Sequence, residues 1–153
     1  MSAADRWGRT LAVCGLVVAL DQGLKALVQS KLVPAEHVDV GLGFEIANVH
    51  NRGAAFGLFA GGQAPVIAVS LLAVVLLGFY LARNIARPGL WLAAGLVVGG
   101  ALGNLADRLR IDAVTDFIDP PLWPAFNLAD VAIVAGVALL LLGLPGRAST
   151  PGR

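Results

Sequence analysis

Long apolar stretches, separated by segments rich in polar residues, glycine or proline, dominate the sequence. A helix needs ~17 to 25 residues to cross a hydrocarbon core of ~30 Å. Four stretches reach that length: residues 11–28, 65–82, 90–109 and 128–144. The pattern predicts an all-α membrane protein with four transmembrane helices in one domain, residues 1–153.

The first connecting segment has a different pattern. Apolar side chains alternate with polar residues or glycine, which is the period of a β-strand, at Val38, Val40, Leu42, Phe44 and Ile46. This alternation predicts a small β-sheet lying against the membrane surface.

The last connecting segment, residues 110–127, contains Pro120, Pro121 and Pro124. Because proline removes a backbone donor and clashes with the preceding turn, these residues exclude a continuous helix and predict an ordered, irregular loop. Residues 146–153 are polar and short of apolar side chains, so we expect a disordered tail.

Composition agrees with a membrane protein. Hydrophobic residues make up 58% of the chain and charged residues 14%, with a mean hydropathy of +0.80. The 11 Lys and Arg residues against 10 Asp and Glu leave no basic excess that would favour nucleic acid as a partner.

The distribution of basic residues predicts the orientation, because Lys and Arg near the ends of spans stay on the cytoplasmic side. With the N-terminus inside, that side would hold Arg6, Arg9, Arg83, Arg87, Arg147 and Arg153. Both termini are then cytoplasmic. Polar residues would gather at the opposite membrane face: Asp21, Lys25, Asn51, Asn104, Asp107, Arg108, Asp116, Asn127 and Asp130. Such gathering predicts a functional site there.

A charge inside a spanning helix costs ~2.5 to 3.5 kcal/mol on insertion scales, so it needs a partner or a use. Asp21 and Lys25 are four residues apart and can form a helical ion pair, which is either purely structural or supports a site. In the third stretch, Gly95, Gly99 and Gly103 recur every four residues and predict a surface for close helix packing. Asp107 continues this stripe, and Asn104 and Arg108 lie on the adjacent row. These three polar residues form either a network that caps the helix end or part of a functional site.

Asp116 and Asp130 are the candidate catalytic residues. Asp130 alone could be an N-terminal helix cap partner of Asn127, and Asp116 alone could be a turn residue. The connection between the third and fourth stretches, however, must return Asp116 toward Asp130. Two carboxylates in a partly dry site hold one proton between them, which is the state that amide hydrolysis needs. His37 and His50 lack metal-site spacing, so we expect surface histidines.

At these positions the chain resembles the lipoprotein signal peptidases, or prokaryotic signal peptidase II. The similar segments are Asp21-Gln22 with Lys25, residues 51–56, residues 99–108, residues 114–117 and residues 126–130. The family often has threonine where this chain has Leu24, which affects one local contact.

The resemblance implies an aspartic peptidase with Asp116 and Asp130 as the catalytic pair and no metal or cofactor. The implied substrates are prolipoproteins in the membrane lipid, cut on the N-terminal side of a cysteine that carries diacylglycerol. Asn51, Asn104, Arg108 and Asn127 would bind substrate, with Asp21, Lys25, Asp107, Gly53, Ala54 and Phe56 in support. The sheet would form a cradle above the pair, and we expect a monomer in the bacterial inner membrane.

Two other functions remain open from the sequence. A small transporter or proton channel could use Asp21, Asp107 and Asp130 as relay groups, although the inner halves of the four stretches contain no acid. A non-catalytic membrane scaffold would need neither Asp116 nor Asp130.

Overall fold

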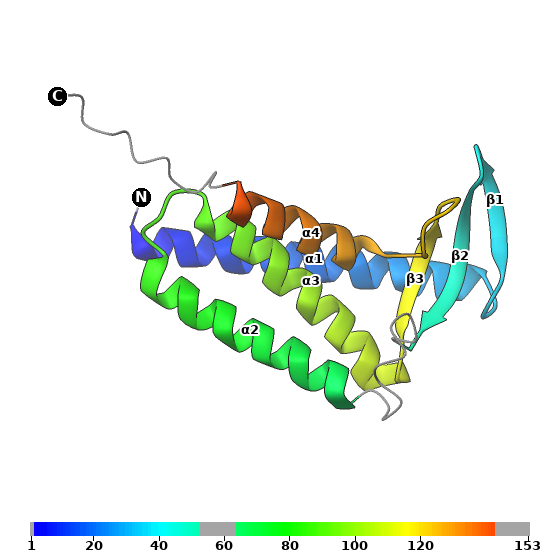
Figure 1. Ribbon diagram of the computed structural model, residues 1–153, viewed down its shortest axis with the longest axis horizontal. Coiled ribbons are helices and arrows are strands. Elements are labelled where there is room, and N and C mark those ends of the chain that lie inside the picture. Colours follow the sequence, from blue (N-terminus) through cyan, green and yellow to red (C-terminus); the bar gives the residue numbers. More distant parts are fainter. Residues whose placement is uncertain (1, 53–63, 143–153) are drawn as a thin grey trace.

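The computed structural model describes residues 2–52 and 64–142. Its elements are, in chain order, α1 (Ala3–Lys31), β1 (His37–Gly41), β2 (Phe44–Asn51), α2 (Ala64–Asn84), α3 (Leu90–Ile111), β3 (Val114–Asp119) and α4 (Leu128–Leu141). The four helices run along the long axis and a three-stranded sheet stands at one end of them (Figure 1). The expected tail, residues 146–153, lies outside the described residues.

Three of the described helices, α1, α2 and α3, are long and apolar enough to span a membrane. The helix α4 is apolar but has 14 residues, fewer than the span predicted over 128–144. Helices α1 and α3 end, and α2 and α4 begin, at the end of the bundle that carries the sheet (Figure 1). This alternation agrees with the predicted gathering of polar residues at one end.

Glycines on α3 set its distance from both neighbouring helices. A Cβ on Gly99 would lie 2.9 Å from the backbone oxygen of Cys14 on α1. A Cβ on Gly100 would overlap the backbone oxygen of Ala129 on α4. The prediction of a close-packing glycine surface on this helix is confirmed, and the polar row at its sheet end is therefore brought against both α1 and α4.

The sheet has the order β1-β2-β3, with antiparallel pairing throughout. The predicted alternation is confirmed as β1 and β2. The prediction of an irregular loop over 110–127 was wrong for β3, where Val114 pairs with Asn51 and Ile118 with Ile46. The prolines lie after this strand. The residue types of β3 favour a strand, and its backbone groups pair with those of β2.

Side-chain hydrogen bonds fix the sheet to the end of α1. Gln29 Nε2 on α1 donates to Thr115 Oγ1 on β3 at 2.7 Å. Asn48 Nδ2 on β2 donates to the backbone oxygen of Leu32, the C-cap of α1, at 2.8 Å. The sheet is thus held in a defined position over the polar end of the helices.

Candidate active site

Asp116 and Asp130 meet through one asparagine. Asp116 is the third residue of β3, and Asp130 lies in the first turn of α4. Asn127, the fully buried N-cap of α4, donates from Nδ2 to Asp116 Oδ1 at 2.7 Å and accepts at Oδ1 from the Asp130 backbone N–H at 3.0 Å. The interpretation of Asn127 as a helix cap is confirmed, and the same side chain also contacts Asp116.

Asp116 is the more deeply buried member of the pair, with 2% of its surface exposed. It also accepts a hydrogen bond at Oδ2 from Asn51 Nδ2, at 2.9 Å. Burial raises the pKa of Asp116 from 3.8 to about 6, aided by the nearby charge of Asp130 and opposed by the hydrogen bonds from Asn51 and Asn127. A carboxyl with such a pKa can hold or release a proton near neutral pH.

Asp130 is half-buried and is held by two donors. Asn104 Nδ2 on α3 donates to its Oδ1 at 2.8 Å, and the Asn127 backbone N–H donates to its Oδ2 at 3.3 Å. The Asp130 carboxyl is thus held in place both by α3, through Asn104, and by the backbone at the start of α4.

Lys25 is the centre of the network behind the pair. Its side chain is completely buried, and Nζ contacts Asp21 Oδ2 at 2.8 Å, Asp107 Oδ2 at 2.9 Å and Asn104 Oδ1 at 3.0 Å. Because an ammonium can only donate, Asn104 must turn its oxygen to Lys25 and its nitrogen to Asp130. The Asp21–Lys25 pair is thus structural and also orients an amide that contacts Asp130.

Both acids bound to Lys25 have further contacts, Asp21 with α4 and Asp107 with the sheet. Asp21 Oδ1 accepts from the Ala129 backbone N–H at 3.0 Å, and Asp107 Oδ2 accepts from the Thr115 backbone N–H at 3.1 Å. The backbone positions next to Asp130 and Asp116 are therefore each fixed by a charged residue from a different element, α1 for Ala129 and α3 for Thr115.

No role was predicted from the sequence for two side chains of this network, Gln22 and Arg110. Gln22 Nε2 donates to Asp107 Oδ1 at 3.1 Å and to the backbone oxygen of Gly103 at 3.0 Å. Arg110 forms an ion pair with Asp107 Oδ1 at 2.9 Å. A polar amide inside a predicted span was the available signal for Gln22, whereas the surface position of Arg110 gave none.

Arg108 lies beside the pair without an ion-pair contact to it among the described residues. Nη1 donates to the backbone oxygen of Asn104 at 3.5 Å, and the charge interacts with Asp130 and Asp116. Its buried Nε has no hydrogen-bond partner among the residues that the structure describes. Gly53, Ala54 and Phe56 lie outside the described residues.

Each aspartate of the pair borders a different pocket. A pocket of about 350 Å³ next to Asp116 is lined by Val49, His50, Asn51, Arg52, Pro124 and Ala125. A pocket of about 450 Å³ runs from Asp130 along α4 and is lined by Trp123, Phe126, Val131, Val134, Ala135 and Ala138. The first lies against the sheet and includes polar groups, and the second is almost wholly apolar.

Comparison with known proteins identifies a family for most of the chain. Residues 13–144 match the family described as signal peptidase (SPase) II. The lipoprotein signal peptidase of Moorella thermoacetica is 45% identical over 90% of this chain and 93% of its own length. That of Halothermothrix orenii is 41% identical over 84% of this chain and 90% of its own.

Two solved structures, each described as a bacterial membrane enzyme, have the same fold. One, determined at 2.3 Å, superposes with a TM-score of 0.83 over 95% of both chains at 24% identity. The other, determined at 1.9 Å, has a TM-score of 0.80 at 26% identity and covers 92% of this chain and 95% of its own.

Proposed function

Since the chain belongs to the signal peptidase II family, we propose that it is a lipoprotein signal peptidase whose catalytic groups are the carboxyls of Asp116 and Asp130. The observation that carries this assignment is that Asn127 donates to both carboxyls at the edge of the helical bundle, from Nδ2 to Asp116 Oδ1 and from its backbone N–H to Asp130 Oδ2. The alternative of a transporter or proton channel has no support, because the matched relatives are peptidases.

The unequal surroundings of the two acids suggest their roles. Asp116, buried and with a pKa raised to about 6, holds the shared proton, and Asp130, with its two donors, is the ionised member. Asp130 takes a proton from water as the water oxygen adds to the scissile carbonyl carbon, and Asp116 gives its proton to the carbonyl oxygen. The proton then on Asp130 passes to the amide nitrogen as the carbon–nitrogen bond breaks. One hydroxyl of the tetrahedral carbon returns its proton to Asp116 as the new carboxyl group forms.

The substrate that fits is a prolipoprotein whose cysteine carries diacylglycerol, cleaved on the N-terminal side of that cysteine. The apolar pocket along α4 begins at Asp130 and would keep an apolar part of the substrate at membrane depth. Asn51 and Arg108, together with Asn104 and Asn127, surround the acids with amide and guanidinium donors for the peptide backbone.

The proposal also includes the orientation of the protein in the membrane. We infer that α4 forms a fourth span together with the residues that follow it, that both termini are cytoplasmic, and that the sheet and the catalytic pair face outward from the bacterial inner membrane. The enzyme needs no metal or cofactor in this reaction and acts as a monomer.

The test is cleavage of a purified diacylglyceryl-modified precursor by the purified protein in detergent. Asp116→Asn and Asp130→Asn should each abolish cleavage while the variants remain folded by gel filtration and thermal unfolding. Asp39→Asn, an exposed acid on β1, is the matched control and should cleave at the wild-type rate. Full activity in either variant of the pair would remove the catalytic assignment.

A second arm tests the lipid requirement. The same precursor without diacylglycerol should be cleaved far more slowly than the modified one. Equal cleavage of both would overturn the proposed lipid recognition while leaving the catalytic pair intact.

A further inference from the structure

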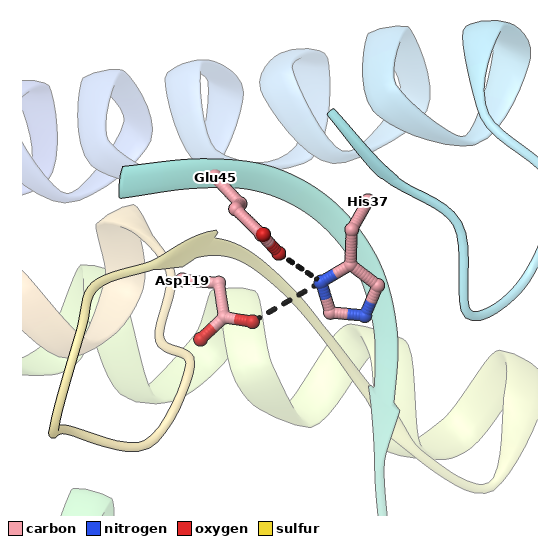
Figure 2. A group of neighbouring side chains, drawn as sticks. All are labelled: His37, Glu45 and Asp119. Atoms are coloured by element: carbon pink, nitrogen blue, oxygen red, sulfur yellow. Dashed lines mark hydrogen bonds and ion pairs between the residues drawn. The ribbon is translucent and has the colours of Figure 1, made fainter. Parts of the chain in front are cut away.

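Three potential metal ligands converge at the end of the sheet that lies away from Asp116. His37 comes from β1, Glu45 from β2 and Asp119 from β3, so each strand contributes one side chain (Figure 2). His37 Nδ1 lies 2.8 Å from Glu45 Oε2 and 3.2 Å from Asp119 Oδ2. One potential metal-ligand atom of each residue lies within 4.8 Å of those of the other two.

The strand register places two negative charges opposite each other here. Glu45 and Asp119 are direct partners in the β2–β3 pairing. Like charges in this position destabilise a sheet unless a cation lies between them. A neutral imidazole carries one N–H and no net charge, so His37 alone supplies this cation only when it is protonated.

The same three groups suit a divalent metal ion better than a neutral histidine. An imidazole nitrogen with two carboxylate oxygens is a ligand set that Zn²⁺ accepts, with water in the fourth position. Ligand atoms ~2.0 to 2.1 Å from a tetrahedral Zn²⁺ are ~3.3 Å apart, close to the 2.8 and 3.2 Å that separate Nδ1 from the two oxygens. Small rotations of exposed side chains would open the cluster enough for the ion.

We propose that His37, Glu45 and Asp119 form a binding site for a divalent transition-metal ion, with Zn²⁺ as the representative. Spacing along the chain predicted that His37 is a surface histidine without a metal. The folded sheet, however, brings Glu45 and Asp119 next to it. The side chains are 38%, 42% and 27% exposed, so the ion exchanges readily with solvent. A bound ion ties all three strands together.

The position of the site gives it a consequence for the rest of the sheet. Asp119 is three residues after Asp116 on β3, and β2 continues from Glu45 to Asn51, which donates to Asp116. A metal at one end of these strands therefore resists their separation at the other. The measurable result is higher thermal stability with Zn²⁺, and this expectation stands apart from the catalytic proposal.

The test is a Zn²⁺ titration of the tag-free, chelator-treated protein in detergent, by calorimetry and by thermal unfolding. The wild type should bind one Zn²⁺ and unfold at a higher temperature with it. Glu45→Gln and Asp119→Asn should each weaken binding at least ~10-fold, because loss of a direct ligand costs no less than loss of a supporting contact.

The chain contains a matched control, because its two histidines are His37 and His50. His50 lies on β2 outside the cluster. His37→Asn should abolish the Zn²⁺-dependent stabilisation, and His50→Asn should keep it. Wild-type binding no tighter than that of His37→Asn, or equal loss in both variants, would overturn the proposal and leave an ion-pair cluster only.

Discussion

Replacing Asp116 with asparagine should alter the stability of the protein in a way that depends on pH. The pKa of this carboxyl is raised from 3.8 to about 6 in the folded state. The folded protein therefore binds this proton more tightly than the unfolded chain does. The ionisation of Asp116 costs nothing below pH ~4, and its cost grows as the pH rises to about 6. At ~1.4 kcal/mol per pKa unit, the cost reaches about 3 kcal/mol above pH 6.

Asparagine removes this cost but adds another that does not change with pH. Asp116 accepts hydrogen bonds from both Asn51 and Asn127. An asparagine at this position has one acceptor oxygen, so its own amide N–H₂ must face one of these donors, at a cost of about 1 to 3 kcal/mol. This hydrogen-bond cost is the same at every pH. Between pH 4 and pH 8, the unfolding free energy of the variant should therefore rise by about 3 kcal/mol relative to that of the wild type.

Thermal unfolding in detergent, followed by tryptophan fluorescence, measures this difference. For a chain of this size, 1 kcal/mol corresponds to ~2 to 4 °C in unfolding temperature. The unfolding temperature of Asp116→Asn minus that of the wild type should therefore increase by about 6 to 12 °C between pH 4 and pH 8. Asp39→Asn, on the exposed strand β1, should follow the wild type at every pH. A difference between Asp116→Asn and wild type that is constant with pH, or that moves the other way, would refute the reasoning.

Two further predictions concern the network behind the pair. Lys25→Met leaves the buried carboxylates of Asp21 and Asp107 without their cation, so it should cost about 3 to 5 kcal/mol of unfolding free energy, and adding Asp21→Asn should restore part of it. Wild-type stability of Lys25→Met in thermal unfolding would contradict this. Gly103→Ala would place a Cβ 2.7 Å from Asp21 Oδ2 and should lower stability by about 1 to 3 kcal/mol. Gly23→Ala, where the added Cβ meets open space, is its control and should be neutral or slightly stabilising; equal effects of the two substitutions would argue against steric conflict.

The arrangement of the site explains how a chain with few polar residues supports a charged centre beside lipid. Lys25 and Arg110 together balance the charges of Asp21 and Asp107, while Asn104 links Lys25 to Asp130. The buried charges compensate one another, and the two acids proposed for catalysis remain at the edge, next to the pockets. A dry, fixed set of donors around them is the condition for shifted acid strengths.

The sequence by itself determined the membrane class, the position of three spanning helices and the polar end of the bundle. Hydropathy is a sum over neighbouring residues, so a long apolar stretch specifies a span without reference to the rest of the chain. The glycine spacing of α3 likewise predicted close packing, because residues four apart share a helix face. The alternation from Val38 to Ile46 predicted β1 and β2 for the same local reason.

The tertiary structure decided which groups meet. Strand β3 forms because β2 offers it partners more than 60 residues earlier in the chain, as in the pairing of Asn51 with Val114. Lys25 and Asn104 are likewise far apart in the sequence. The hydrogen bond from Lys25 to the Asn104 oxygen turns the amide nitrogen of Asn104 toward Asp130. Partners of this kind depend on the positions of whole elements in space, and no local pattern of residues contains that information.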